Sequence, residues 1–210
     1  MFNLPSLYNM ALMLPAILLG LTFHEFAHGW VANRLGDRTA RDLGRLTVNP
    51  LAHVDPVGLV LLFVAGFGWA KPVPINPNNF RGDIQRGILL VSLAGPATNM
   101  LMAVASAVIW GAFAGFKLPY FNEIMYNLIQ INVVLGIFNL IPIPPLDGSK
   151  ILAGILPGRQ KWLYQLEAYG AILLIILVFT GAISIIFKIF VHPIVDVLIS
   201  LARGVAQLLT

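Results

Sequence analysis

Residues 4–31, LPSLYNMALMLPAILLGLTFHEFAHGWV, decide the fold class, because they form one apolar stretch that ends in a cluster of ionisable side chains. A helix of about 20 apolar residues crosses the ~30 Å hydrocarbon core of a bilayer. The stretch lacks the basic start and the small-residue cleavage site of a signal peptide, so we interpret it as a retained span. His24, Glu25 and His28 near its end are costly inside a membrane unless they face a cavity or a partner, which indicates a functional role.

The composition of the whole chain supports a membrane protein. Apolar residues make up 58% of the 210 residues and charged residues only 10%, whereas soluble domains carry about 25% charge. This excludes an ordinary soluble domain, a disordered tail and a nucleic-acid module. The net charge of +4 would suit nucleic acid, but in membrane proteins basic residues mark the cytosolic loops, so we expect no nucleic-acid partner. The chain has no cysteine, so any metal must be held by His, Asp or Glu.

Three further apolar runs predict spans, at residues 87–116, 124–141 and 168–190. The tail, residues 193–209, is apolar but carries Asp196 and Arg203. It is therefore either an amphipathic interfacial helix or a marginal fifth span. The chain is then an all-α polytopic membrane protein of four to five transmembrane helices, folded as a single domain over residues 1–210.

Residues 57–80 are expected to differ from the spans. A helix over 57–69 reaches only about 20 Å, so we expect a short re-entrant segment. Three prolines in KPVPINPNNF, residues 71–80, exclude a helix there and predict a small membrane-associated β-strand or a loop. Because Pro72 and Pro74 share one edge of such a strand, the amides of Val73 and Ile75 lie on the other edge. A substrate strand added to either edge would be held by β-augmentation.

The basic residues predict the orientation. With the N-terminus outside, the inner segments hold ten of the thirteen Lys and Arg residues, and the opposite orientation leaves them three. The ten are Arg34, Arg38, Arg41, Arg45, Lys71, Arg81, Arg86, Lys150, Arg159 and Lys161. We therefore expect an outside N-terminus and cytosolic inner ends of the spans.

The HEFAH motif, residues 24–28, predicts half of a metal site. Residues i and i+4 share one face of a helix, so His24 and His28 can bind one ion. Glu25 can then reach a water molecule on that ion, as in the zincin arrangement of two His ligands and a general base. The alternative is that His28, six residues before Arg34, only reaches the membrane interface.

Asp147 is the leading candidate for a third ligand, with His53 and Asp55 as further candidates. It lies in NLIPIPPLDG, residues 139–148, at the end of a span that also runs inward. The prolines stop the helix and free backbone groups, which are tolerated at membrane depth only inside protein or beside water. A carboxylate beside such a break is a plausible ligand, and the alternative is that it caps the following helix.

Four motifs in this order resemble the site-2 protease family of intramembrane zinc metalloproteases, peptidase family M50. They are HEFAH, then NPLAHVDPVG at 49–58, GPATN at 95–99 and NLIPIPPLDG at 139–148. The resemblance covers roughly residues 5–190 and is strongest to short prokaryotic members without PDZ or CBS domains.

The resemblance implies roles for single residues. His24, His28 and Asp147 match the ligands of one Zn²⁺ per chain, and Glu25 matches the general base. Asn99 matches an Asn that helps to stabilise the oxyanion. Spacing alone favours the alternative that Asn99 makes an interhelical hydrogen bond beside a Gly-Pro packing kink.

Further residues match less defined positions of the family. Asn139 and Pro142 correspond to positions near the substrate path. His53 and Asp55 lie in a family motif to which we assign no metal role, only loop structure or cavity lining.

The sequence therefore predicts a zinc-dependent intramembrane endopeptidase of the prokaryotic cell membrane. Its expected substrates are single-span membrane proteins in the lipid bilayer, cleaved toward the cytosolic side. Two other functions use the same residues: a zinc transporter, which needs exchangeable ligands along a path, and a non-catalytic scaffold that binds membrane helices.

Overall fold

The computed structural model describes residues 6–65, 68–116, 118–156 and 166–209, and within this part every regular element is a helix. Four helical segments are long and apolar enough to cross a membrane: Leu7–Arg34, Ile84–Ala112, Phe121–Asn139 and Ala182–Leu209. The all-α polytopic class predicted from the sequence is confirmed. Arg159 and Lys161, used above to predict the orientation, lie outside the described residues.

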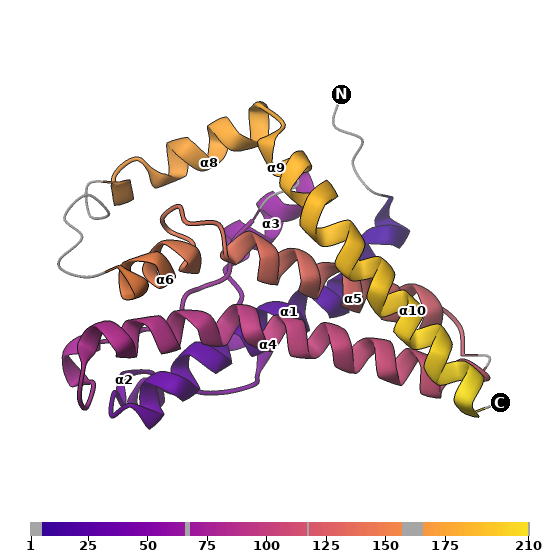
Figure 1. The fold of residues 1–210 in the computed structure, drawn as a ribbon, viewed down its shortest axis with the longest axis horizontal. Helices are drawn as coiled ribbons and strands as arrows, with labels where there is room; N and C mark the ends of the chain where they lie inside the picture. Colours follow the sequence, from indigo (N-terminus) through magenta and orange to yellow (C-terminus); the bar gives the residue numbers. More distant parts are fainter. Residues whose placement is uncertain (1–5, 66–67, 117, 157–165, 210) are drawn as a thin grey trace.

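Helix α4, Ile84–Ala112, is the centre of the bundle. It packs against α1, Leu7–Arg34, against α5, Phe121–Asn139, and against α10, His192–Leu209, which crosses it in Figure 1. It also packs against the short helix α6, Asp147–Ile155. Every element that carries a residue of the predicted metal site is therefore in contact with α4.

The two ends of the bundle are defined by contacts between helix termini. At one end the Arg81 amide donates to Leu35 O at 2.7 Å, which brings the start of α4 to the end of α1. At the other end the Trp110 indole donates to Asn122 Oδ1 at 2.9 Å, which joins the end of α4 to the start of α5. Helices α1 and α5 therefore both run antiparallel to α4, and their C-terminal ends lie on the same side.

The C-terminal region differs from the predicted boundaries. The predicted span 168–190 is divided into α8, Gly170–Phe179, and a second helical run that begins with α9, Ala182–Ile186. Gly181 between them has φ +76°, in the left-handed region that favours glycine, so the helix cannot continue through it. At ten residues α8 is about 15 Å long, too short to cross a bilayer.

The tail is part of a full-length candidate span rather than a separate interfacial or marginal helix. Helix α9 continues through a π-helical turn, η3, Phe187–Val191, into α10, so that residues 182–209 form one helical run. The sequence analysis placed the boundary beside Pro193. Prolines are tolerated inside membrane helices when local π adjustments relieve the lost hydrogen bond, and η3 is such an adjustment.

Residues 53–80 form a short hairpin and an extended segment. Helix α3, Pro56–Ala65, is ten residues long, which agrees with a re-entrant segment. Residues 66 and 67 of the predicted 57–80 region lie outside the described residues. The chain returns to form an isolated antiparallel bridge between Val54 and Ala70.

The predicted β-strand does not form in the described residues of this region. Residues 71–76 are without regular structure, and we call them the extended segment. The Lys71 amide donates to His53 O at 2.8 Å, but Pro72 and Pro74 have no amide hydrogen, so alternate ladder positions are missing. Short helices α2, Thr39–Asp42, η1, Pro50–Ala52, and η2, Pro77–Asn79, complete the described elements.

Candidate metal centre

Three buried ligand atoms meet where α1 and α6 approach α4. His24 Nε2 and His28 Nε2 are 3.0 Å apart, and each lies 3.1 Å from Asp147 Oδ2. The two histidines are one helical turn apart on α1, which places both rings on one face. The structure therefore brings together the two His residues and the Asp that the sequence predicted as ligands, and together they form a group able to hold a metal ion.

Asp147 reaches the histidines because of a tight turn between α5 and α6. Helix α5 ends at Asn139, and α6 begins at Asp147 itself after the Pro-rich connection. Gly148 lies so close to Leu140 O and Ile141 O that a Cβ there would collide with both carbonyl oxygens. The proline-broken connection thus folds back on itself and directs the carboxylate at α1.

Hydrogen bonds from α4 fix the orientation of both histidine rings. His28 Nδ1 donates to Val91 O at 2.7 Å, and His24 Nδ1 donates to Asn99 Oδ1 at 2.7 Å. Because Nδ1 of each ring makes one of these hydrogen bonds, the two Nε2 atoms face each other. This pairing of a ligand His with a second hydrogen-bond partner is typical of metal sites.

The converging atoms fit a zinc ion. Two Nε2 lone pairs and a carboxylate oxygen repel one another unless a cation lies between them, and Asp147 Oδ2 is buried without a hydrogen bond from any residue that the structure describes. A tetrahedral zinc site with bonds near 2.0 Å places its ligand atoms about 3.3 Å apart, close to the observed separations. Two His and one carboxylate leave a fourth position for water, as in catalytic zinc sites.

Gly95 on α4 provides the space for this group. A Cβ at Gly95 would lie 2.5 Å from His28 Nε2 and 2.5 Å from His24 Cε1. Any other residue would displace both rings, so this glycine is required by close approach. The sequence motif GPATN therefore supplies two parts of the centre, the gap at Gly95 and the amide of Asn99.

Glu25 is half-buried on α1, beside the ligands in sequence. Its Oε2 accepts a hydrogen bond from the Val73 amide at 2.7 Å. The Val73 side chain is buried and lies against Gly29, where a Cβ would be 3.2 Å from Val73 Cγ2. The extended segment thus rests on α1 and holds one oxygen of the carboxylate.

The other residues predicted to bind substrate lie around this centre with separate contacts. Ile75 is partly buried in a cluster formed by Ala32, Phe80 and Val91. Asn139, the last residue of α5, donates to Leu135 O of its own helix at 3.0 Å, and Pro142 is exposed in the connection before Asp147. The structure places all three near the ends of α1, α4 and α5.

His53 and Asp55 lie outside the metal group and organise the α3 hairpin. His53 is 1% exposed, and its Nε2 donates to Thr47 O at 2.8 Å. Asp55 Oδ1 accepts from the amides of Gly58 and Val57, at 3.0 and 2.9 Å, and so caps α3. The hydrogen bond from Gly58, followed by that from Val57, lowers the pKa of the Asp55 carboxyl. Both residues therefore have the loop role that the sequence suggested.

Asp37 and Asn132 are buried polar residues that the sequence did not predict. Asp37 follows α1 and is fully buried; its carboxylate accepts from Asn76 N at 2.7 Å and from Asn79 Nδ2 at 2.9 Å. Asn132 on α5 is also fully buried and accepts from Asn99 Nδ2 at 2.9 Å. The available signals were a polar amide inside an apolar run and an Asp directly after a glycine at a helix end.

The chain is similar to known proteins whose names describe them as zinc metalloproteases, most of them as putative ones. The model of "Peptidase family M50" matches residues 116–183. "Putative zinc metalloprotease YwhC" of Bacillus subtilis is 41% identical over 172 residues, 78% of each chain. "Putative zinc metalloprotease Rip2" of Mycolicibacterium smegmatis is 32% identical over 193 residues, 82% of this chain and 68% of the relative.

A more distant relative comes from an archaeon. "Zinc metalloprotease MJ0392" of Methanocaldococcus jannaschii is 23% identical over 177 residues, 83% of this chain and 44% of the relative. No solved structure matches the chain at a significant level.

Proposed function

The chain belongs to peptidase family M50 and is a zinc metalloprotease, and on this premise we propose that it cleaves peptide bonds within or near transmembrane segments of other membrane proteins. The observation that carries the proposal is the convergence of His24, His28 and Asp147 between helices that are long and apolar enough to span a bilayer. His24, His28 and Asp147 would hold one zinc ion. When bound, zinc activates a water molecule and polarises the substrate carbonyl.

Glu25 is proposed as the general base. Its Oε2 is held by the Val73 amide, so Oε1 remains to accept a proton from the attacking water. The carboxyl then gives this proton to the leaving amine. The Val73 hydrogen bond restricts rotation of the carboxylate, which favours proton transfer in a fixed geometry.

The contacts of Asn99 favour a positioning role. Its Oδ1 accepts from His24, and its Nδ2 donates to Gly20 O at 3.1 Å and to Asn132 Oδ1 at 2.9 Å. The expected contact with an oxyanion would require one of the Nδ2 hydrogen bonds to break. We propose that the main role of Asn99 is to hold His24 in position. A direct contact with the oxyanion is its secondary role, because it requires one of these hydrogen bonds to break.

The extended segment is proposed to bind unwound substrate through its proline edge. A helical substrate must unwind before its carbonyl carbon is attacked, and its freed amides then need acceptors. Val73 N is already bonded to Glu25 and Lys71 N to His53 O. The carbonyl groups of Pro72 and Pro74 receive no hydrogen bond from the described residues, so a substrate strand would donate to them, with Val73, Ile75, Asn139 and Pro142 lining its path.

We further propose that the N-terminus is outside and that the zinc site lies toward the cytosol in a prokaryotic cell membrane. His24 and His28 lie in the second half of α1, Asp147 begins α6 shortly after the inner end of α5, and most basic residues lie on the same side. Single-span membrane proteins are the proposed substrates.

The test is cleavage of a single-span substrate by the purified protein in liposomes. Glu25→Gln keeps the side-chain volume and removes the base, so we expect cleavage to stop while zinc content is retained. Cleavage at the wild-type rate by Glu25→Gln would exclude this mechanism. Zinc flux into liposomes that Glu25→Gln leaves unchanged would favour a transporter instead.

A further inference from the structure

Asn132 on α5 is a buried amide that none of the roles above requires. It is 0% exposed, and the span that contains it is otherwise largely apolar. A side-chain amide in such surroundings costs several kcal/mol unless its donors and acceptor are paired. The partners of Asn132 therefore indicate why an amide stands there.

Those partners form a chain of hydrogen bonds that ends on a metal ligand. Asn132 Nδ2 donates to Leu128 O at 2.8 Å, one turn earlier on α5. Asn132 Oδ1 accepts from Asn99 Nδ2 at 2.9 Å, and Asn99 Oδ1 accepts from His24 Nδ1 at 2.7 Å. The chain crosses from α5 through α4 to α1, and its side chains are all buried.

Each hydrogen bond in this chain fixes the direction of the next. Because Asn132 Nδ2 is bonded to a carbonyl, its Oδ1 must face Asn99. Asn99 is thereby held with Nδ2 toward Asn132 and Gly20 O, so its Oδ1 faces His24. An acceptor at this position keeps the proton on His24 Nδ1 and leaves Nε2 free for a metal. If Asn99 turned over, its Nδ2 would face His24 and favour the tautomer that cannot bind metal.

Close helix packing leaves the chain little freedom to rearrange. A Cβ at Gly20 would lie 3.3 Å from Asn132 Oδ1 and 2.8 Å from Leu135 Cδ1. A Cβ at Gly136 would collide with Met100 Cε. Both glycines let α5 approach its neighbours, as small residues do in membrane helix interfaces.

We propose that Asn132 is a positioning residue which, through Asn99, holds His24 in the tautomer and orientation that bind zinc. This inference rests on the proposed zinc site. Loss of an outer partner of a metal ligand commonly weakens metal affinity 10- to 100-fold. Because Gly20 O also holds Asn99, we expect the smaller effect, about 10-fold, when Asn132 is replaced.

The experiment measures zinc affinity of the purified full chain by competition with a chelator, and the absorption spectrum of the Co²⁺-loaded protein. Asn132→Leu removes both hydrogen bonds. Asn132→Ser is the milder second variant, because its hydroxyl can still donate to Leu128 O but is too short to reach Asn99. Both variants should bind zinc about 10-fold more weakly and show a changed Co²⁺ spectrum.

Two controls separate positioning from folding and from failure of the site itself. Ser106→Ala removes a buried hydroxyl that donates a hydrogen bond to Met102 O of its own helix. This variant should leave the zinc affinity and the Co²⁺ spectrum unchanged. His24→Ala should abolish tight binding. If His24→Ala fails to bind zinc but Asn132→Ser keeps the wild-type affinity and spectrum, the inference about Asn132 is overturned. Wild-type affinity in His24→Ala would instead overturn the zinc site.

Discussion

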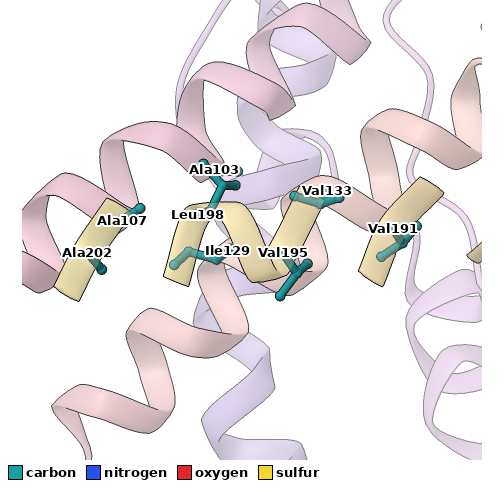
Figure 2. Packing of buried hydrophobic residues seen from close by; sticks show 8 residues of the cluster. All are labelled: Ala103, Ala107, Ile129, Val133, Val191, Val195, Leu198 and Ala202. Carbon is teal, nitrogen blue, oxygen red and sulfur yellow. The ribbon is translucent and has the colours of Figure 1, made fainter. Parts of the chain in front are cut away.

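Two regions of the bundle are held together by different means. Around the metal centre, α1, α4 and α5 are joined by hydrogen bonds between buried polar groups and by glycines at contact points. In the other region, α4, α5 and the C-terminal helical run pack around a cluster of buried aliphatic side chains, as Figure 2 shows. The residues of this aliphatic cluster are Ala103, Ala107, Ile129, Val133, Val191, Val195, Leu198 and Ala202.

The difference shows which positions tolerate change. Aliphatic packing loses free energy in proportion to the volume removed and can partly relax. Polar groups at the metal centre need specific partners in a fixed orientation, and a buried group that loses its partner is costly. Small changes should therefore weaken zinc binding or catalysis in the first region and only lower stability in the second.

Gly95→Ala should have the largest effect. The new methyl group would occupy the space of His24 and His28, so zinc affinity should fall at least about 100-fold. Chelator competition measures the affinity, and Gly204→Ala, at a glycine with open space around it, is the matched control. Unchanged affinity in Gly95→Ala would show that the two rings are not confined as described.

Val73→Pro should have the second-largest effect. Proline removes the amide that binds Glu25, so kcat should fall about 10- to 100-fold through loss of alignment of the base. Zinc content should stay at the wild-type level. Val73→Ala keeps the amide and is the control for lost packing. Equal kcat values for the two variants would show that the hydrogen bond from Val73 to Glu25 does not contribute to catalysis.

Asp37→Asn should lower stability without touching the zinc ligands. Burial raises the pKa of Asp37, but hydrogen bonds from Thr39, Asn79 and Asn76 outweigh it, so the pKa lies below its ordinary value of 3.8. The stabilisation is then fully present above pH 3.8 and is lost as the pH falls through the lower pKa of the folded protein. Asn cannot accept from all these donors, and we expect a loss of about 1.5–3 kcal/mol.

Thermal unfolding in detergent measures this loss at several pH values. The difference between wild type and Asp37→Asn should be constant from about pH 7 to pH 5 and shrink only in stronger acid. Asp42→Asn, at an exposed position on α2, is the control. A difference that already disappears at pH 5 would contradict the lowered pKa.

Ile129→Val should have the smallest effect and probes the aliphatic cluster. Removal of one buried methylene costs about 0.5–1.5 kcal/mol. Zinc affinity and kcat should match wild type. Loss of zinc binding in Ile129→Val at unchanged helicity would show that the two regions are not independent.

The sequence predicted the ligands of the metal centre better than the buried polar residues that hold the surrounding helices and loops in place. The pairing of His24 with His28 follows from helical spacing, whereas the proline break made Asp147 only one candidate, which the family resemblance then assigned as the third ligand. Asp37 and Asn132 were missed because the partners that link them to other elements, Asn76 and Asn99, are 39 and 33 residues away in the chain. Residues that depend on contacts across the fold leave no local pattern.

The extended segment and the C-terminus show that the structural effect of a proline is hard to predict from the sequence. The prolines do remove alternate amide donors from the extended segment, but the partner of Val73 is a carboxylate on α1 rather than a strand. At the C-terminus Pro193 looked like the boundary, whereas the helix breaks at Gly181. Proline lacks an amide, yet a membrane helix accommodates it, and the left-handed backbone of Gly181 stops the helix outright.

The central claim is that ligands from α1 and α6 share one zinc ion. Zinc content per chain, measured on purified wild type, His24→Ala and Asp147→Ala, tests it most directly. We expect about one zinc per wild-type chain and a strong loss in both variants. Full zinc content in Asp147→Ala would contradict a site shared between the two helices.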